Sequence, residues 1–155
     1  MRILKIATAA VLALLVLGVV LAPLGPLPGI FIGGTETTVP EAWFDTSAIH
    51  EIDLEVPGAL RRVVTVWVIQ LNGNLHVVGS KESVWVSMLG QSGPVRIRIG
   101  DKTYPMTANR MVAGWKPVLL AYQNKYRPDY PDIIGGFPPI EAAIKTTAVF
   151  RLVGR

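Results

Sequence analysis

The sequence predicts a mainly β protein in which six antiparallel strands close into a small barrel with one or two helices, preceded by a single transmembrane helix. Three observations lead to this expectation. Six short segments alternate in polarity or are rich in β-branched residues, Asn72-Gly73 and Gly100-Asp101 join two pairs of them as tight hairpins, and no β–α–β alternation indicates a parallel sheet. A two-sheet sandwich is the alternative arrangement of the same strands.

The first two predicted strands differ in how they are covered. In residues 49–56, Ile52, Leu54 and Val56 alternate with acidic residues, which is typical of a half-buried strand. Residues 61–71 are apolar on both faces, which predicts a central strand covered on both sides. The apolar residues on both faces of such a central strand are best buried when the sheet closes on itself as a barrel. The remaining predicted strands are residues 75–79, 95–99, 102–108 and 146–155.

Two helices are expected between these strands. Residues 83–89 form a short helix that Gly90 ends, and residues 117–126 carry Val118, Tyr122 and Tyr126 at helical spacing after Pro117. Residues 127–139 are rich in proline and glycine and predict a loop, and residues 140–144 can form one helical turn. Pro105 has no N–H to donate, so its strand is expected to lie at an edge or to carry a bulge there.

The first 40 residues indicate a membrane anchor and a stalk. Residues 6–24 contain no charged residue and would extend about 28 Å as a helix, close to the ~30 Å of a bilayer core. A cleaved signal peptide is the alternative, but Pro23 directly follows the best cleavage site at Val20-Leu21-Ala22. The predicted parts are a cytoplasmic N-terminus (1–5), a transmembrane signal anchor (6–24), a linker (25–40) and the barrel domain (41–155).

The distribution of Lys and Arg predicts on which side of the membrane the domain lies. Arg2 and Lys5 precede the apolar segment, and no Lys or Arg follows it until Arg61. By the positive-inside rule the protein is a single-pass protein of the inner (plasma) membrane, with its globular domain on the extracytoplasmic side. From Arg61 onward there are thirteen basic and five acidic residues, a balance that can attract an anion. Basic residues do not alternate with aromatic ones, so no nucleic acid is expected as a partner.

Residues that would support independent catalysis are scarce. The sequence has two histidines and no cysteine, and it contains no HExxH, GxSxG or GxxxxGK[ST] motif. No metal site is therefore expected, and no catalytic residue can be named. If the protein catalyses a reaction, a bound cofactor is expected to supply the chemistry.

One long stretch resembles a known superfamily. The segment "VVTVWVIQLNGNLHVVGSKESVWVSMLGQSGPVRIRIGDKTYPMTA", with Lys125-Tyr126 and the closing "FRLVGR", is similar to the split β-barrel flavin-binding superfamily. That group includes the pyridoxamine-phosphate oxidases and the deazaflavin-dependent nitroreductases. The resemblance implies a split barrel that binds FMN or the deazaflavin F420, with haem also possible, commonly as a homodimer.

The resemblance also implies cofactor-binding residues. Hydroxyl and basic side chains would contact the phosphate, other residues would line the ring, and Trp85 is either a stacking partner for the ring or a core residue of its short helix. Ser80-Lys81 is equally well explained as a solvated loop, because the turn carries a single Lys next to Glu82. The implied phosphate contacts are Arg62, Thr65, Ser80, Lys81 and Ser83, and the implied ring contacts are Trp67, Val78, Gly79 and Trp85.

Two functions follow from these observations. The first is a membrane-anchored flavin- or deazaflavin-binding oxidoreductase, nitroreductase-like, that acts on a small molecule. The second is a non-enzymatic barrel, tethered to the bilayer through residues 6–24, that binds a ligand or a partner protein. A pure assembly factor that acts through its helix is a third possibility with little positive support.

Overall fold

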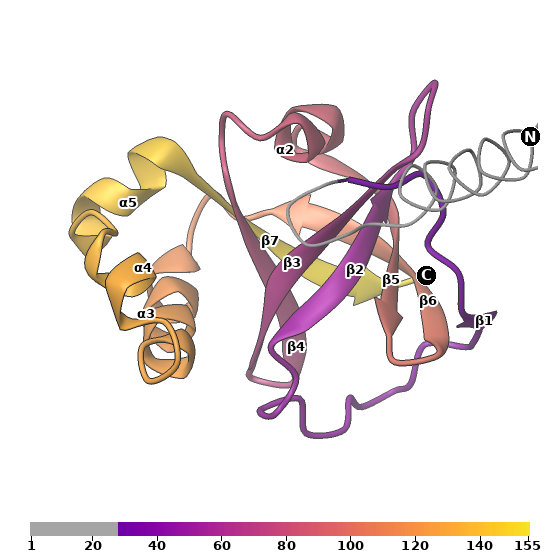
Figure 1. The fold of residues 1–155 in the computed structure, drawn as a ribbon, viewed down its shortest axis with the longest axis horizontal. Coiled ribbons are helices and arrows are strands. Elements are labelled where there is room, and N and C mark those ends of the chain that lie inside the picture. The colour runs from indigo at the N-terminus through magenta and orange to yellow at the C-terminus, as the bar shows by residue number, and fades with distance from the viewer. Residues whose placement is uncertain (1–27) are drawn as a thin grey trace, which may run out of the picture.

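The computed structural model describes residues 28–155, and the predicted anchor at residues 6–24 lies outside them. Within residues 28–155, six antiparallel strands close into a barrel in the order β6-β5-β2-β3-β4-β7, because β7 also pairs with β6 (Figure 1). The prediction of a barrel rather than a sandwich is confirmed. The strands are β2 (Glu51–Val56), β3 (Arg62–Leu71), β4 (Asn74–Ser80), β5 (Ser92–Ile99), β6 (Lys102–Arg110) and β7 (Thr147–Gly154).

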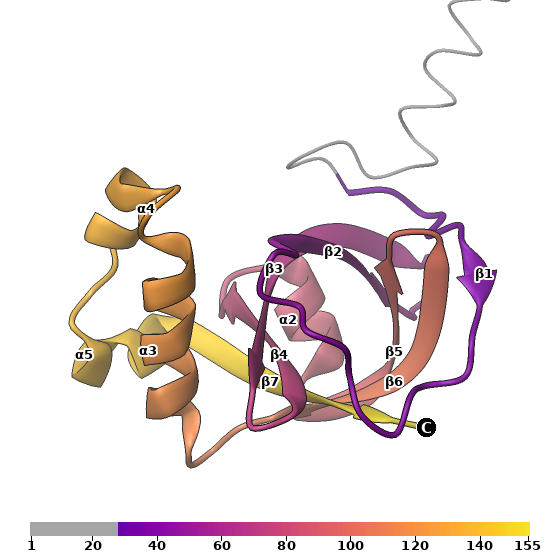
Figure 2. The same ribbon diagram turned by 90° about the horizontal axis from the view of Figure 1, so that it is seen from below.

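The described part of the chain contains more helices than the one or two predicted. Besides the helix α2 (Val84–Leu89) and the helix α3 (Trp115–Tyr126), there are two short helices after α3, α4 (Pro131–Gly135) and α5 (Ile140–Thr146). The sequence predicted a loop at α4 because proline and glycine flank it, but Pro131 occupies the first helical position, where its missing N–H costs nothing. Figure 2 shows α2 within the ring of strands and α3, α4 and α5 to one side of it.

The interior of the barrel is filled with side chains. Inward-facing residues of all six strands pack against α2, whose Trp85 is buried and lies 5.6 Å from the ring of Phe150, measured between ring centroids. Gly90, with φ +60°, ends this helix as the sequence predicted. The barrel therefore has a packed core that α2 closes at one end.

A second hydrophobic cluster lies outside the barrel. The outward face of β3, β4 and β7 is covered by α3 to α5, and Tyr122 and Tyr126 of α3 are buried against Ile69 of β3 and Val149 of β7. This explains why residues 61–71 are apolar on both faces: one face lines the barrel interior and the other packs under α3.

Pro105 lies where one edge of β6 changes its partner. Residues 106–110 pair with β7, and Lys102 and Thr103 pair with the short strand β1 (Thr35–Glu36). Pro105 falls between these two ladders, so its missing N–H removes no ladder hydrogen bond. The predicted edge character of this position is thus local, within a closed barrel.

The described part of the predicted linker lies on the barrel. Gly29 exchanges two backbone hydrogen bonds with Val63 of β3, at 2.9 and 2.8 Å, and the side chain of Ile32 is buried. Arg98 of β5 donates to the carbonyl of Ile32 at 3.0 Å. No helix within residues 28–155 has the length and apolar composition needed to cross a bilayer.

Candidate functional site

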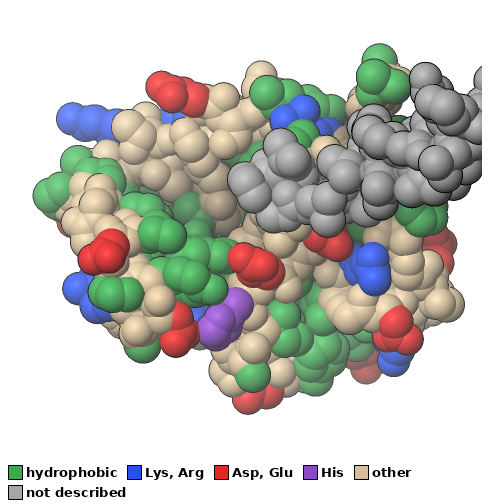
Figure 3. All heavy atoms as spheres, viewed as in Figure 1, with side chains coloured by type: hydrophobic (Ala, Val, Ile, Leu, Met, Phe, Trp, Pro, Cys, Tyr) green, Lys and Arg blue, Asp and Glu red, His purple; other side chains and the backbone are tan. Residues whose placement is uncertain are grey.

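A mostly apolar cavity of about 250 Å³ lies between the outer wall of the barrel and the helices α3 and α5. Its walls combine the end of β4, the start of β7, one face of α3 and the segment that joins α4 to α5. Figure 3 shows hydrophobic side chains gathered on this face over the junction of the helices and the barrel. The lining residues are Val78, Gly79, Ser80, Leu119, Tyr122, Gln123, Phe137, Pro138, Ala143, Thr146 and Thr147.

The barrel side of this cavity depends on a glycine. A Cβ at Gly79 would overlap the ring of Trp85 and approach Val86 to 2.8 Å, both on α2 inside the barrel. Only glycine therefore lets β4 pass so close to the helix that closes the barrel. The neighbouring Val78 faces outward into the second cluster, so β4 forms a thin wall between the core and the cavity.

Aromatic residues form the helical side. The ring of Tyr122 stacks on Phe137 with centroids 6.2 Å apart and an interplanar angle of 16°. Burial, with a smaller contribution from Tyr126, raises the pKa of Tyr122 far above its ordinary value of 10.0. The hydroxyl, which is protonated at neutral pH even at the ordinary pKa, therefore stays protonated in more alkaline solution as well and can donate a hydrogen bond to a ligand.

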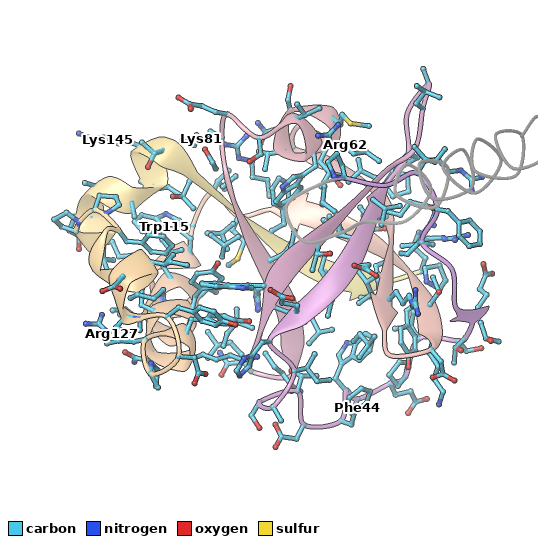
Figure 4. The ribbon with its side chains drawn as sticks, viewed as in Figure 1. Phe44, Arg62, Lys81, Trp115, Arg127 and Lys145 are labelled. Carbon is cyan, nitrogen blue, oxygen red and sulfur yellow. The ribbon has the colours of Figure 1, made fainter. Side chains whose placement is uncertain are left out.

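Hydroxyl groups and cations surround the mouth of the cavity. Ser80 is paired with Thr147 in the β4–β7 ladder, and the N–H of Lys81 donates to the carbonyl of Thr146 at 2.8 Å. Lys81 and Lys145 are both exposed beside these residues, and Figure 4 shows them on the same side of the molecule. The Ser80 hydroxyl accepts from the N–H of Glu82 at 3.2 Å, and the Thr146 hydroxyl donates to the carbonyl of Ala143 at 3.3 Å. Hydroxyl and ammonium side chains of this kind suit an anionic group such as a phosphate.

The structure divides the nine predicted site residues into three groups. Val78, Gly79 and Ser80 line the cavity, and Lys81 lies beside it, with its N–H on the carbonyl of Thr146. Ser83 is the N-cap residue of α2, although its side chain makes no capping hydrogen bond, and Trp85 is buried in the barrel core. The remaining three, Arg62, Thr65 and Trp67, are on β3 and do not line the cavity.

The three residues of β3 have other surroundings. Arg62 is half-buried at the α2 end of the barrel, where its Nε is buried without a hydrogen-bond partner among the described residues. Thr65 donates to Asp53 Oδ1 at 2.9 Å in a separate polar pocket. Trp67 stacks on Tyr126 with centroids 4.2 Å apart and planes 12° apart.

The Lys125-Tyr126 pair fastens α3 to the barrel. The Tyr126 hydroxyl accepts from the N–H of Val68 at 2.9 Å and lies 2.6 Å from the carbonyls of His50 and Val68. Lys125 Nζ donates to the carbonyls of Thr46, Ile49 and Val68 at 2.7 to 3.1 Å, and burial lowers its pKa. These bonds satisfy backbone groups of Val68 in β3 and of residues 46–50, the segment that precedes β2.

A cavity of about 420 Å³ beside Lys125 is less suited to a ligand. Lys125 already donates to three carbonyls, and Gln70 Oε1 accepts from both the N–H and the hydroxyl of Thr46 at 3.1 Å. No group of three His, Cys, Asp or Glu side chains within residues 28–155 is placed to bind a metal ion. Of these two cavities, the one under α3 and α5 is therefore the better candidate site.

The sequence predicted only three of the eleven residues that line this cavity, Val78, Gly79 and Ser80. Leu119, Phe137, Thr146, Thr147 and Lys145 come from segments that carry no ligand-binding motif. Their position depends on the pairing of Ser80 with Thr147, two residues far apart in the sequence. The signal in the sequence was the apolar helical spacing of α3, which includes Tyr122.

No protein-family model and no curated protein matches the chain. Among solved structures, the chain is similar to a NimC/NimA family protein from Clostridium acetobutylicum, with 16% sequence identity and a TM-score of 0.48. The similarity covers 66% of this chain and 72% of that protein.

Proposed function

We propose that this protein binds an anionic cofactor with a flat ring in the cavity between the barrel and the helices α3 and α5. The observation that carries the proposal is that one cavity combines the aromatic side chains of Tyr122 and Phe137 with the hydroxyl residues Ser80, Thr146 and Thr147. Two exposed lysines, Lys81 and Lys145, adjoin these hydroxyl residues in the sequence. Ligand sites commonly combine such apolar walls with a few convergent polar groups.

The residues present suit a phosphorylated flavin or deazaflavin, FMN or F420. Val78, Tyr122 and Phe137 would contact the ring, and the Tyr122 hydroxyl would donate a hydrogen bond to one of its polar atoms. Ser80 and Thr147, with Lys81 nearby, would hold the phosphate. When bound, such a cofactor supplies hydride transfer to a small molecule.

Haem fits the cavity less well. The residues that line it include no His, Cys or Met, which are the common axial ligands of haem iron. Tyr122 can ligate iron only as a phenolate, and burial opposes that form. FMN and F420 are therefore the cofactors that the donor set favours.

The activity we propose is reduction of a small quinone-like or nitroaromatic molecule by a membrane-anchored oxidoreductase. Residues 6–24 would be the anchor in the inner membrane and would hold the domain on the extracytoplasmic side, as their apolar length and flanking charges predict. A homodimer, which the sequence resemblance implies, is part of the same proposal.

Two observations favour the alternative of a non-enzymatic binding protein. The cavity, at about 250 Å³, is smaller than the roughly 300–1,000 Å³ of typical ligand pockets, so it would enclose the ring of a flavin but not the whole cofactor. Tyr122 is also the only residue with an ionisable side chain among those that line the cavity. A smaller apolar ligand would then occupy the cavity without chemistry.

A binding titration separates these functions. The full-length protein is purified in detergent, and visible absorbance is recorded as FMN, F420 or haem is added. The proposal predicts a saturable change with FMN or F420 that follows one binding site per chain. If none of the three binds, the oxidoreductase function is lost and the non-enzymatic alternative stands.

A further inference from the structure

The hairpin between β2 and β3 carries exposed apolar residues at the end of the barrel that α2 closes. Leu60 in the hairpin turn has 78% of its surface exposed. On α2, Val84 and Met88 are 52% and 36% exposed and lie four residues apart, on the same face of the helix. A Cβ on Gly58 would lie 2.8 Å from the Met88 Cε, so the turn and the helix form one continuous surface, which we call the hairpin face.

Cations accompany these apolar residues. From Pro57 to Leu89 the sequence contains Arg61, Arg62, Lys81 and a single acidic residue, Glu82. The side chain of Arg61 is 64% exposed, and Figure 4 shows Arg62 beside α2. Exposed apolar side chains bordered by arginines are typical of surfaces that lie in the headgroup region of a bilayer.

A cavity at the base of the hairpin adds further positive charge. It has a volume of about 260 Å³, and Arg61, Arg96 and Arg155 line it together with Glu55. Glu55 is buried, with Arg96 Nε at 3.2 Å and Arg61 Nη1 at 4.0 Å, and Glu36 lies 4.0 Å from Arg96 Nη1. Three arginines and one glutamate line the cavity, and this excess of positive charge can attract an anion.

The attachment of the chain places this end of the barrel near the proposed anchor. Gly29 is held to Val63, the second residue of β3, by two backbone hydrogen bonds. Leu24, the last residue of the apolar segment, is five residues before Gly29, a distance of at most roughly 18 Å for an extended chain. The start of β3, and with it the hairpin, is therefore tied close to the membrane surface.

We propose that the hairpin face docks on the membrane that holds residues 6–24, with Leu60, Val84 and Met88 among the lipid headgroups and Arg61 on the phosphates of anionic lipids. This inference rests on the membrane anchor of the proposed function. It orients the domain so that the end closed by α2 faces the bilayer. Figure 4 shows that Phe44 lies at the other end of the barrel, which then faces away from the lipid.

A lipid surface is the occupant that the observations favour. The face is small and combines a protruding leucine with arginines, and the proposed anchor keeps it permanently next to lipid. Without the anchor, so few exposed apolar residues would give weak binding, because membrane affinity scales with the buried apolar area and the attraction to anionic lipid.

The absence of cysteine makes the test direct. The full chain carrying Leu60→Cys is labelled with an environment-sensitive fluorophore and reconstituted into phosphatidylcholine vesicles with or without phosphatidylglycerol. Quenching by lipids that carry a spin label near the headgroup is then measured. Phe44→Cys, at a residue 49% exposed, is the matched control, and both positions tolerate substitution because they are exposed.

The proposal predicts at least about twofold stronger quenching at position 60 than at position 44, a stronger effect with phosphatidylglycerol, and a loss of that added effect with Arg61→Glu. Equal quenching at the two positions, in protein that stays in the vesicles after an alkaline wash, overturns the docking and leaves the anchor intact. Release of the protein by the wash overturns the anchor and the docking together, and leaves cofactor binding to its own titration.

Discussion

The two hydrophobic clusters of this protein differ in composition and in access. The cluster inside the barrel consists of aliphatic residues with a few aromatic ones, and α2 seals it. The cluster outside the barrel, under α3 to α5, is rich in tyrosine and tryptophan and borders a cavity. Several of its side chains are only partly buried. The comparison teaches that the barrel interior is used for stability, whereas the outer wall provides the space and the polar groups for a ligand.

The largest expected effect comes from emptying the interior. Phe150 is fully buried and contacts Trp85, so Phe150→Ala should lower the free energy of unfolding by about 3–5 kcal/mol. Urea denaturation measures the change. Phe44→Ala, at a half-exposed position, should shift it by less than about 0.5 kcal/mol. A loss below 1 kcal/mol for Phe150→Ala would mean that the interior is loosely packed.

A smaller loss is expected where the outer cluster is fastened to the barrel. Tyr126→Phe removes a hydroxyl that bonds to backbone groups of Val68 and His50, so it should cost about 2 kcal/mol of unfolding free energy. Tyr130→Phe, which removes a hydroxyl at the partly exposed edge of the same cluster, serves as the control. Equal effects of the two variants would contradict the role assigned to Tyr126.

The thin wall between the two clusters can be tested at Gly79. Gly79→Ala places a methyl group against Trp85 and should destabilise the protein by about 1–2 kcal/mol through overpacking. Gly135 in α4 is the control, because a Cβ there meets no atom within 4 Å and alanine favours the helix. Thermal denaturation of both variants decides the point: a stable Gly79→Ala protein would mean that β4 and α2 are not in close contact.

Removing a cation at the mouth of the cavity should weaken binding without affecting folding. Lys81→Ala and Lys145→Ala are each expected to raise the dissociation constant for FMN or F420 about tenfold, which corresponds to about 1.4 kcal/mol. The exposed Lys102 on β6 provides the control variant, Lys102→Ala. Unchanged affinity in both cavity variants would place the phosphate elsewhere.

The smallest effect concerns pH. His76 faces outward from β4 but is buried, with Nδ1 lacking a hydrogen-bond partner among the described residues, and burial lowers its pKa below the ordinary 6.5. As the pH is lowered, His76 in the unfolded chain takes up a proton at a higher pH than His76 in the folded protein. The free energy of unfolding should therefore decrease as the pH falls below about 6.5. His76→Gln should make the urea midpoint less dependent on pH between neutral and mildly acidic conditions. An identical pH dependence in both proteins would exclude His76 as its source.

The barrel was predictable because its rules are local. Alternation in residues 49–56 fixes which side chains face inward, and Asn72-Gly73 fixes a hairpin, with Asn72 and Gly73 both at positive φ. Apolar residues on both faces of β3 required cover on both sides, and the structure supplies it with the barrel core and α3. The short helix α4 was missed because proline and glycine are common both in loops and at the two ends of a short helix.

The site was predictable only in part. Val78, Gly79 and Ser80, which line the cavity, could be predicted because they follow the hairpin at Asn72-Gly73, which the sequence defines. Thr147 could not be found, since no local signal states that β7 returns beside β4. Phe137 lies between α4 and α5, and no local signal states that this segment packs against Tyr122 of α3. Arg62 and Thr65 come from the same reasoning as Ser80, but β3 carries them to other surroundings, and their roles remain predictions.

The central claim is that the ligand binds against the outside of the barrel and not within it. A cofactor titration that compares Ser80→Tyr, which narrows the cavity mouth, with Leu75→Ala, which opens the buried interior, tests it most directly. We predict that Ser80→Tyr weakens FMN or F420 binding at least about tenfold with little loss of stability, whereas Leu75→Ala lowers stability by about 2–5 kcal/mol and leaves affinity unchanged. Undiminished binding by Ser80→Tyr, or weakened binding by a folded Leu75→Ala protein, would contradict the account.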